Sequence, residues 1–241
     1  MNFLADTPRL ELLRIAGIPV EVDITFALVP IFLFGVLQQS LVGFSVLVAG
    51  VFLSILLQHE FGHALFARLF GVPVGEILVG GFYGYAQMLA PPPSKLANII
   101  ILFAGPLTNG LIFLLCWNAL GQPDIGLTGR FGEIDPAAWL DSRWKLHAVL
   151  TLGTINLAML IFNLLPAFPL DGGRIYRDIL GAFLSDKVAT QTVALLGVIV
   201  GSWSAFIGFR IDLVLLLIGA QIAIINWSIL KGPRPDEMVS S

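Results

Sequence analysis

Long stretches without a charged residue constrain the fold of this chain more than any other feature. Five of them are residues 24–58, 96–123, 146–170, 188–209 and 213–230. A helix needs about 20 apolar residues to cross the hydrocarbon core of a membrane. The first stretch is long enough for two crossings if the chain turns near residues 38–43. We therefore expect an all-α polytopic membrane protein with about six spans, at roughly 24–38, 43–69, 96–120, 147–165, 189–207 and 212–230.

The composition excludes several other classes of protein. Hydrophobic residues make up 57% of the 241 residues and charged residues only 12%, whereas soluble domains carry about a quarter charged residues. An ordinary soluble enzyme and a disordered chain are therefore excluded. The net charge of −3 gives no reason to expect a nucleic-acid partner, and the single cysteine, Cys116, excludes an intramolecular disulfide.

The segment between the second and third predicted spans is not helical in character. It is rich in glycine around Gly80 and Gly81 and ends in three consecutive prolines at 91–93, which disfavour a continuous helix. The pattern predicts a short β-hairpin over residues 74–88. Non-helical backbone at membrane depth is tolerated only against protein or a wet cavity, so we expect a re-entrant hairpin beside a water-filled site. An ordinary interfacial loop is the alternative.

The distribution of lysine and arginine predicts the orientation in the membrane. With the N-terminus inside, nine of these residues lie on the inner side and four on the outer side, and cytoplasmic loops carry the excess of positive charge. We expect both termini inside, residues 121–146 in an external loop, and a location in a bacterial or archaeal cytoplasmic membrane. Residues 1–23 lack the pattern of a cleaved signal peptide.

The candidate chemistry begins with the pentapeptide His59-Glu60-Phe61-Gly62-His63. A spacing of four residues puts both imidazoles on one helix face. Two such nitrogens suit Zn²⁺, and Glu60 is placed to take a proton from a water held by the metal. Ionisable residues within a membrane span are costly and usually functional. The alternative is a polar helix end with Glu60 paired to a histidine.

A catalytic zinc site needs a third protein ligand, and Asp171 is the candidate at the matching depth. It ends the uncharged run 146–170 and precedes Gly172 and Gly173, which permit a tight turn. An aspartate before a helix is equally typical of an N-cap, here for a helix over 174–184. The residue pattern alone leaves these two roles of Asp171 open.

Several segments together resemble the site-2 protease family of intramembrane zinc metalloproteases. They are residues 59–71, residues 163–174, Gly105-Pro106 with Asn109, and Gly80-Gly81 with 86–88. The resemblance spans residues 17 to about 185. It implies zinc as cofactor, His59, His63 and Asp171 as its ligands, and Glu60 as general base and acid. It also suggests that the Asn163 amide lies near the scissile carbonyl; a hydrogen bond to a neighbouring helix is the alternative role of Asn163. Independently of the resemblance, Gly80 and Gly81 leave the hairpin surface free of side chains, so we expect an extended substrate to contact them.

The resemblance further implies hydrolysis of peptide bonds in single-span membrane proteins. The orientation predicted from lysine and arginine puts the active site toward the cytoplasm. We expect a single metalloprotease domain over residues 1–241, consisting of a core at 17–185 and two further spans within 189–230. No PDZ or CBS domain is expected, and Asp23 stands where several relatives have histidine. The alternative function is a metal-ion transporter or sensor using the same His/His/Asp site; a catalytically dead scaffold is disfavoured because all four core residues are present.

Overall fold

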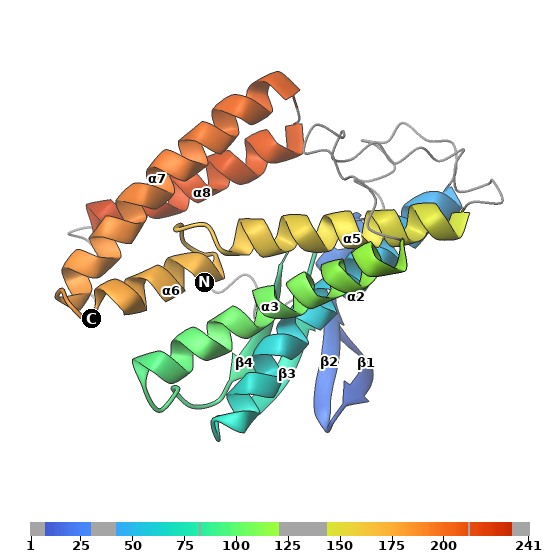
Figure 1. Cartoon of the computed structure of the whole chain (residues 1–241), viewed down its shortest axis with the longest axis horizontal. Helices are drawn as coiled ribbons and strands as arrows, with labels where there is room; N and C mark the ends of the chain where they lie inside the picture. Colours follow the sequence, from blue (N-terminus) through green and yellow to red (C-terminus); the bar gives the residue numbers. More distant parts are fainter. Residues whose placement is uncertain (1–7, 30–41, 82, 121–143, 212, 233–241) are drawn as a thin grey trace. The chain divides into compact units, whose positions relative to one another are not determined.

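The computed structural model describes residues 8–29, 42–81, 83–120, 144–211 and 213–232. Figure 1 shows its helices and strands, coloured along the sequence. The chain divides into two compact units. One unit comprises Met1–Pro92 and Ala104–Leu160, and the other comprises Pro93–Phe103 and Ile161–Ser241. The first contains a small sheet and the His-Glu-x-x-His helix, and the second contains Asp171.

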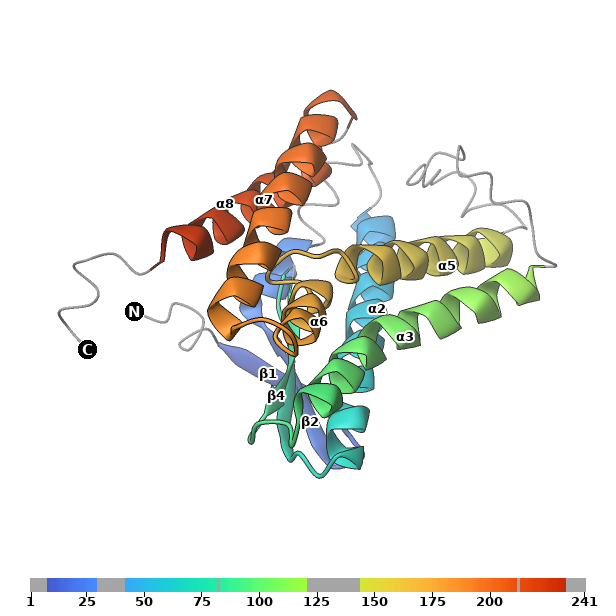
Figure 2. The same ribbon diagram turned by 60° about the vertical axis from the view of Figure 1, so that its left-hand side comes forward.

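The first unit contains a four-stranded sheet with the order β1-β2-β3-β4. Its strands are β1 (Arg9–Ile15), β2 (Ile18–Asp23), β3 (Val74–Val79) and β4 (Gly84–Met88), and Figure 2 shows the sheet from a second side. The predicted hairpin over 74–88 is confirmed as the antiparallel pair β3–β4. The sheet also includes two strands within residues 9–23, which were not predicted from the sequence. The re-entrant position of the β3–β4 hairpin remains a prediction.

Local turn chemistry explains the β1–β2 hairpin, whereas β3 joins it by a contact distant in sequence. Ala16 and Gly17 both have positive φ, at 51° and 79°, which is the conformation that a tight two-residue hairpin turn requires. β3 then pairs with β2 in parallel and with β4 in antiparallel register. Ile77, Leu78 and Val79 are consequently buried, as expected for a central strand.

Helix α2 (Val42–Leu69) packs against β3 and β4. The other long helices of this unit are α5 (Trp144–Asn163), up to Leu160, and α3 (Lys95–Ala119), from Ala104 onward. A short helix η1 (Ile24–Ala27) follows β2. α3 remains helical through Pro106.

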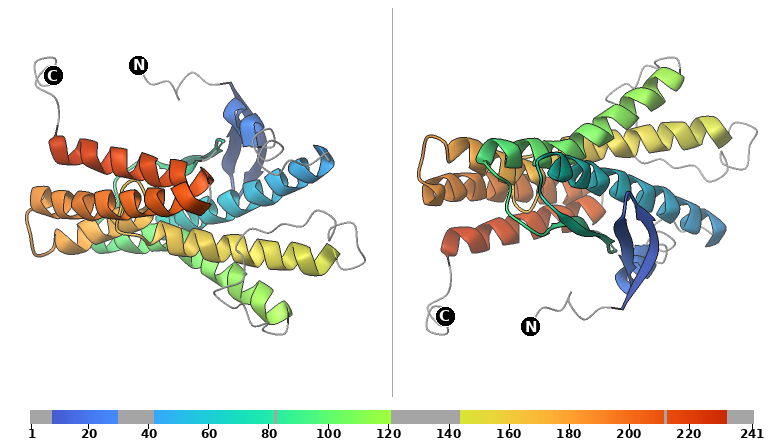
Figure 3. Two further views of the ribbon diagram at one scale, coloured as in Figure 1. Left: turned by 90° about the horizontal axis from the view of Figure 1, so that it is seen from above. Right: turned by 90° about the horizontal axis from the view of Figure 1, so that it is seen from below.

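The second unit is built around a helical pair that approaches closely. α6 (Asp171–Leu180) leads into α7 (Asp186–Ile211), and α7 packs against α8 (Leu213–Lys231). The two long helices lie side by side in both panels of Figure 3. A side chain at Gly201 or Gly219 would overlap backbone of the other helix. Small residues at such crossings are typical of membrane helices.

Three described helices are long and apolar enough to cross a membrane: Lys95–Ala119, Asp186–Ile211 and Leu213–Lys231. The apolar helix Val149–Asn163 is shorter. Helices are found where the spans 43–69, 96–120, 147–165, 189–207 and 212–230 were predicted, within a few residues at each end. The greater part of the predicted span 24–38 and most of the predicted loop 121–146 lie outside the described residues. The count of six spans therefore stays a prediction.

Candidate metal centre

Two imidazoles on α2 form the centre of the candidate site. His59 and His63 are buried, and their Nε2 atoms lie 3.1 Å apart. Tetrahedral zinc with nitrogen ligands at 2.0–2.1 Å sets two such nitrogens roughly 3.3 Å apart. The pair therefore fits a single zinc ion that accepts one lone pair from each ring.

A hydrogen bond from α3 fixes the tautomer of His59. The Nδ1 atom of His59 lies 2.6 Å from Oδ1 of Asn109. The amide Nδ2 of Asn109 donates to Asn156 at 2.8 Å, so Oδ1 is the acceptor and His59 Nδ1 carries the proton. The lone pair of His59 is thereby left on Nε2, the nitrogen that faces His63. Metal-binding histidines generally donate their second ring N–H in this way.

The amide chain continues into α5 and ends on backbone. Asn156 accepts from Asn109 through Oδ1, and its own Nδ2 donates to the Leu152 carbonyl at 2.8 Å. Both asparagine side chains are fully buried. A buried amide that both accepts and donates avoids the free-energy penalty of an unpaired polar group. Asn109, which the sequence marked only through the family resemblance, therefore contacts a candidate metal ligand.

Two glycines let α3 approach the histidine pair. A Cβ atom at Gly105 would overlap the His63 ring and lie 2.9 Å from Cε1 of His59. A Cβ at Gly62, within the pentapeptide, would lie 2.7 Å from the Ala104 carbonyl oxygen. The missing side chain of Gly105 therefore leaves the room that the two imidazoles occupy.

Glu60 lies against the last strand of the sheet. Its side chain is 7% exposed, and a Cβ atom on Gly84 would lie 3.0 Å from its Cγ and 3.1 Å from its Oε1. Gly84 is the first residue of β4. The side chain of the candidate general base therefore extends from α2 and packs against β4.

The loop between β3 and β4 is fastened to the end of β2. Asp23 is buried and accepts hydrogen bonds from the Thr25 backbone N–H at 2.7 Å, the Thr25 hydroxyl and the Tyr83 hydroxyl. Burial acts to raise the pKa of Asp23, and the bonds from Thr25 and Tyr83 outweigh it, so its pKa is lowered. Burial and Asp23 raise the pKa of Tyr83 to about 12. The tyrosine therefore stays protonated and donates at neutral pH.

Gly80 and Gly81, predicted to contact substrate, have packing partners within the first unit. A Cβ atom at Gly80 would overlap the Tyr83 ring, and one at Gly81 would lie 2.8 Å from the Thr25 carbonyl oxygen. Gly81 N–H donates to the Thr25 hydroxyl at 2.9 Å. This packing explains why both positions are glycine. Contact of Gly80 and Gly81 with a substrate stays a prediction.

Asp171 belongs to the second unit, where it is the first residue of α6 and 9% exposed. Leu170 occupies the N-cap position, so the helix begins at Asp171 and not at 174 as the capping alternative required. A Cβ atom at Gly172 or Gly173 would lie 2.5 Å from backbone of the preceding loop. These glycines therefore serve close packing of residues 164–167 against α6, and not a turn.

The donor set suits zinc. Among the described residues, two imidazole nitrogens and a carboxylate oxygen, from His59, His63 and Asp171, make up the group that could hold a metal ion. Two nitrogens and one oxygen leave an open position for water, as catalytic zinc sites require. Asn163, the last residue of α5, is half-buried in the second unit.

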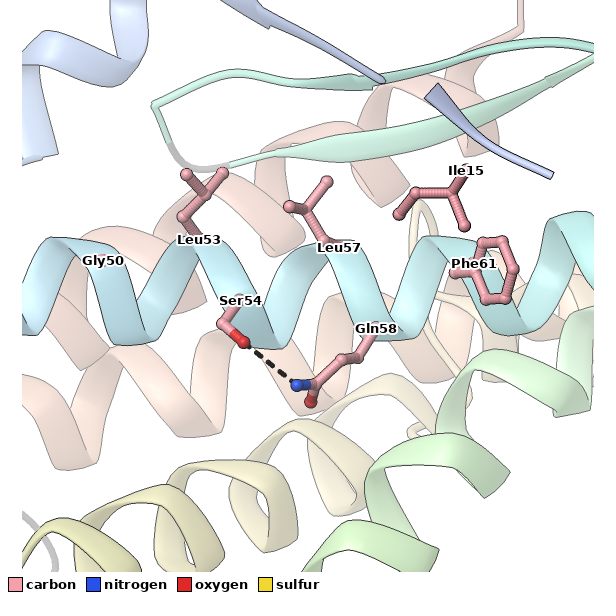
Figure 4. A pocket seen from close by; sticks show the side chains of 7 residues that line it. All are labelled: Ile15, Gly50, Leu53, Ser54, Leu57, Gln58 and Phe61. Atoms are coloured by element: carbon pink, nitrogen blue, oxygen red, sulfur yellow. Dashed lines mark hydrogen bonds between the residues drawn. The ribbon is translucent and has the colours of Figure 1, made fainter. Parts of the chain in front are cut away.

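A cavity of about 380 Å³ lies along α2 and is separate from this centre (Figure 4). It is lined mainly by apolar side chains, with Ser54 and Gln58 as its polar residues: Ile15, Gly50, Leu53, Ser54, Leu57, Gln58 and Phe61. Helical spacing puts these residues of α2 on the face opposite His59 and His63. The cavity is therefore not the candidate metal centre.

Comparison with known proteins identifies the family. The model of peptidase family M50 matches residues 47–123 and 129–207. The chain is 33% identical over 187 residues to the zinc metalloprotease MJ0392 of Methanocaldococcus jannaschii, covering 76% of this chain and 50% of that protein. It is 32% identical over 197 residues to the putative zinc metalloprotease Rip3 of Mycobacterium tuberculosis, covering 78% and 45%. The chain thus spans about half the length of these curated relatives.

A solved structure agrees with this assignment. The site-2 protease from Methanocaldococcus jannaschii superposes with a TM-score of 0.62 at 26% identity, covering 94% of this chain and 97% of that one. The apolar helices described above fit an integral membrane protein of this kind. The predicted resemblance is confirmed: this chain belongs to peptidase family M50, the zinc metalloproteases.

Proposed function

We propose that this chain is an intramembrane zinc metalloprotease that hydrolyses peptide bonds of membrane-spanning proteins. The observation that carries the proposal is the buried pair His59 and His63, whose Nε2 atoms lie 3.1 Å apart. Glu60 lies on the same turn of α2. The names of the relatives support the same chemistry. Single-span membrane proteins are the proposed substrates.

In the proposed site, Asp171 supplies the third ligand beside His59 and His63. Zinc bound there would polarise the scissile carbonyl and lower the pKa of a water molecule. Glu60 takes the proton from the attacking water and delivers it to the leaving amine. The Asn163 amide donates to the carbonyl oxygen, where negative charge develops.

The substrate must be extended before hydrolysis, because a helical peptide bond is shielded by its own hydrogen bonds. We propose that the unwound substrate adds to the sheet as a further strand. The sheet of the first unit ends at β4, and Gly84 of β4 packs on Glu60. A peptide added at that edge would run beside the proposed base.

A reconstituted cleavage assay tests the proposal with three variants. The purified chain and a tagged single-span substrate are combined in liposomes, and zinc content is measured by atomic absorption. Glu60→Gln should keep one zinc per chain and lose cleavage by about 100-fold or more, because only proton transfer is removed. His63→Ala and Asp171→Ala should lose zinc and cleavage together.

The same liposomes distinguish the transporter alternative. Zinc flux across the bilayer without substrate cleavage would contradict the proposal, as would near-normal turnover by Glu60→Gln. Natural substrates are then found by comparing membrane proteomes of cells carrying the wild-type chain or Glu60→Gln. Single-span proteins that accumulate intact in the variant are the expected result.

A further inference from the structure

The loop that carries Asp171 has a backbone residue whose hydrogen bonds come from another helix. Residues 164–170 connect α5 to α6 and contain two prolines, which cannot donate backbone hydrogen bonds. Several bonds close within the loop, from Ala167 N–H to the Leu165 carbonyl and from Leu170 N–H to the Ala167 carbonyl. Phe168, between them, is bonded differently.

Both backbone groups of Phe168 are bonded to the side chain of Asn226 on α8. Phe168 N–H donates to Oδ1 of Asn226 at 3.1 Å, and Nδ2 of Asn226 donates to the Phe168 carbonyl at 2.7 Å. The second hydrogen of Nδ2 goes to the Ile222 carbonyl at 2.8 Å. Asn226 is fully buried, so each of these bonds is protected from water and costly to lose.

The helical pair α7–α8 is shaped to hold this amide in place. A Cβ atom at Gly197 of α7 would overlap the Asn226 side-chain amide. Gly197 is itself buried. The amide therefore has a fixed orientation, with one helix supplying it and the other leaving room for it.

We infer that Asn226 is a positioning residue for the Asp171 carboxylate, acting through Phe168. This rests on the proposed role of Asp171 as a zinc ligand. Phe168 precedes Asp171 by three residues. Gly172 and Gly173, which follow Asp171, have no side chains and so allow α6 to pack closely against the same loop. Asn226 lies beyond residues 47–207, the region that the family model matches. The last helix therefore contributes to the metal site and is not only a further anchor.

The test measures zinc affinity of the full chain in detergent by competition with a chelator. Asn226→Leu, which removes all three bonds, should weaken zinc binding about tenfold or more, as loss of a ligand-orienting partner does. Asn226→Gln keeps an amide that can both accept and donate on a longer side chain, so its loss should be smaller. Gln221→Leu, an exposed amide on the same helix, is the matched control and should bind zinc normally.

A second readout separates positioning from general destabilisation. Zinc that binds only the folded chain raises its melting temperature by an amount set by its affinity. Asn226→Leu should shrink this zinc-dependent increase, whereas a purely structural loss lowers the apo and zinc-loaded melting temperatures equally. Gly197→Ala, which displaces the amide from the neighbouring helix, should reproduce the smaller increase. Should Asn226→Leu not fold, Asn226→Gln and Gly197→Ala carry the comparison.

Asp171→Ala is measured alongside to keep the two proposals apart. If Asp171→Ala binds zinc as tightly as the wild type, the ligand assignment is wrong and this inference falls with it. If Asp171→Ala loses zinc while Asn226 and Gly197 variants keep wild-type affinity and the full zinc-dependent increase, only the positioning role of Asn226 is overturned.

Discussion

Buried asparagine amides orient the polar groups of this site because one amide can both accept and donate. The Asn109 amide accepts a hydrogen bond from His59 Nδ1–H and donates one to Asn156. The Asn226 amide accepts from the N–H of Phe168 and donates to its carbonyl. In apolar surroundings an unpaired polar atom costs free energy. Each amide therefore keeps one orientation, because any other orientation would leave a buried polar atom without a hydrogen bond.

The first prediction concerns Asn109. Asn109→Leu removes the acceptor for His59 Nδ1–H and frees the ring to rotate or change tautomer. Zinc affinity should fall about 10- to 100-fold, as for other partners of metal-binding histidines. Equilibrium competition with a chelator measures the change. Asn109→Asp keeps an acceptor for His59 and should retain more of the affinity.

Asn118→Leu is the control for that experiment, since Asn118 lies on the same helix and is exposed. Equal zinc affinity in Asn109→Leu and wild type would show that the tautomer of His59 is set elsewhere. A loss shared equally by Asn118→Leu would point to a general effect of removing an amide from α3.

A second prediction concerns Tyr83→Phe. The variant removes a hydrogen bond to the ionised, buried Asp23, worth about 1–3 kcal/mol of unfolding free energy. Because the pKa of Asp23 is lowered from 3.8 in the folded chain, the stability it contributes is present above that value and lost as pH falls. The difference between variant and wild type should be full at pH 7 and shrink below pH 3.8.

Melting temperatures of zinc-free protein in detergent measure this difference without interference from metal loss. Tyr85→Phe is the matched control: Tyr85 also donates to a carboxylate, that of Glu76, but at an exposed site. It should change stability by no more than about 0.5 kcal/mol. A Tyr83→Phe deficit that persists undiminished in acid would mean that the tyrosine acts by packing alone.

Residue spacing identified the candidate catalytic residues but not the residues that hold them and the neighbouring loops in place. His59, Glu60 and His63 are local in sequence, and helical periodicity is enough to put the histidines on one face. Asp23 and Tyr83 are 60 residues apart, and Phe168 and Asn226 are 58 apart. No local pattern marks such pairs. A buried polar residue in an apolar span, such as Asn226, is the one available signal, and it names no partner.

At the scale of elements, apolar length predicted the helices and failed for half of the sheet. The α2 helix was expected at 43–69 and is found at Val42–Leu69. The β3–β4 hairpin was predicted from glycines and β-branched residues. β1 was missed because the alternation of charged and apolar residues that indicates a strand is interrupted at Leu12-Leu13, where its pairing with β2 is irregular. β2 was missed because its parallel pairing with β3 joins residues far apart in sequence.

The missed strands change which edge of the sheet is available to a substrate. β3 is bonded on both sides, so proline at 77, 78 or 79 would break the sheet and would not test docking of a substrate. Gly80 N–H donates to the Tyr83 carbonyl, and antiparallel bonds alternate along a strand. Residues 85 and 87 therefore point their backbone groups toward β3, and residues 84, 86 and 88 point theirs outward.

The third prediction follows from this alternation. Ala86→Pro removes an outward N–H, which edge strands tolerate, and should reduce cleavage of a transmembrane substrate at least tenfold with zinc content unchanged. Ala86→Val keeps the N–H and should cleave normally. Gln87→Pro removes an inward N–H and should instead lower the melting temperature. Wild-type cleavage by Ala86→Pro would exclude docking at this edge.

At the scale of the whole molecule, the membrane orientation decides which compartment the Glu60 site serves. The nine-to-four distribution of lysine and arginine predicts both termini inside. The prediction is tested by single cysteines at Asp135 and at Ser185, which is exposed between α6 and α7. The native Cys116 is buried and packs on Gly153, where a Cβ would lie 3.0 Å from its own Cβ. Cys116→Ala, which adds no atoms, is therefore the suitable background.

A membrane-impermeant thiol reagent applied to intact cells should label position 135 and leave position 185 unlabelled until the membrane is opened. The positive-inside rule is the physical reason, since short loops rich in lysine and arginine stay on the cytoplasmic side. Residues 171–187 carry Arg174, Arg177 and Lys187 beside the proposed ligand Asp171. Labelling of 185 from outside, with 135 protected, would invert the topology and require substrates to be cut from the outer face. Labelling of both positions from outside would contradict the single span predicted between them, because two positions on the same side of a membrane are separated by an even number of crossings.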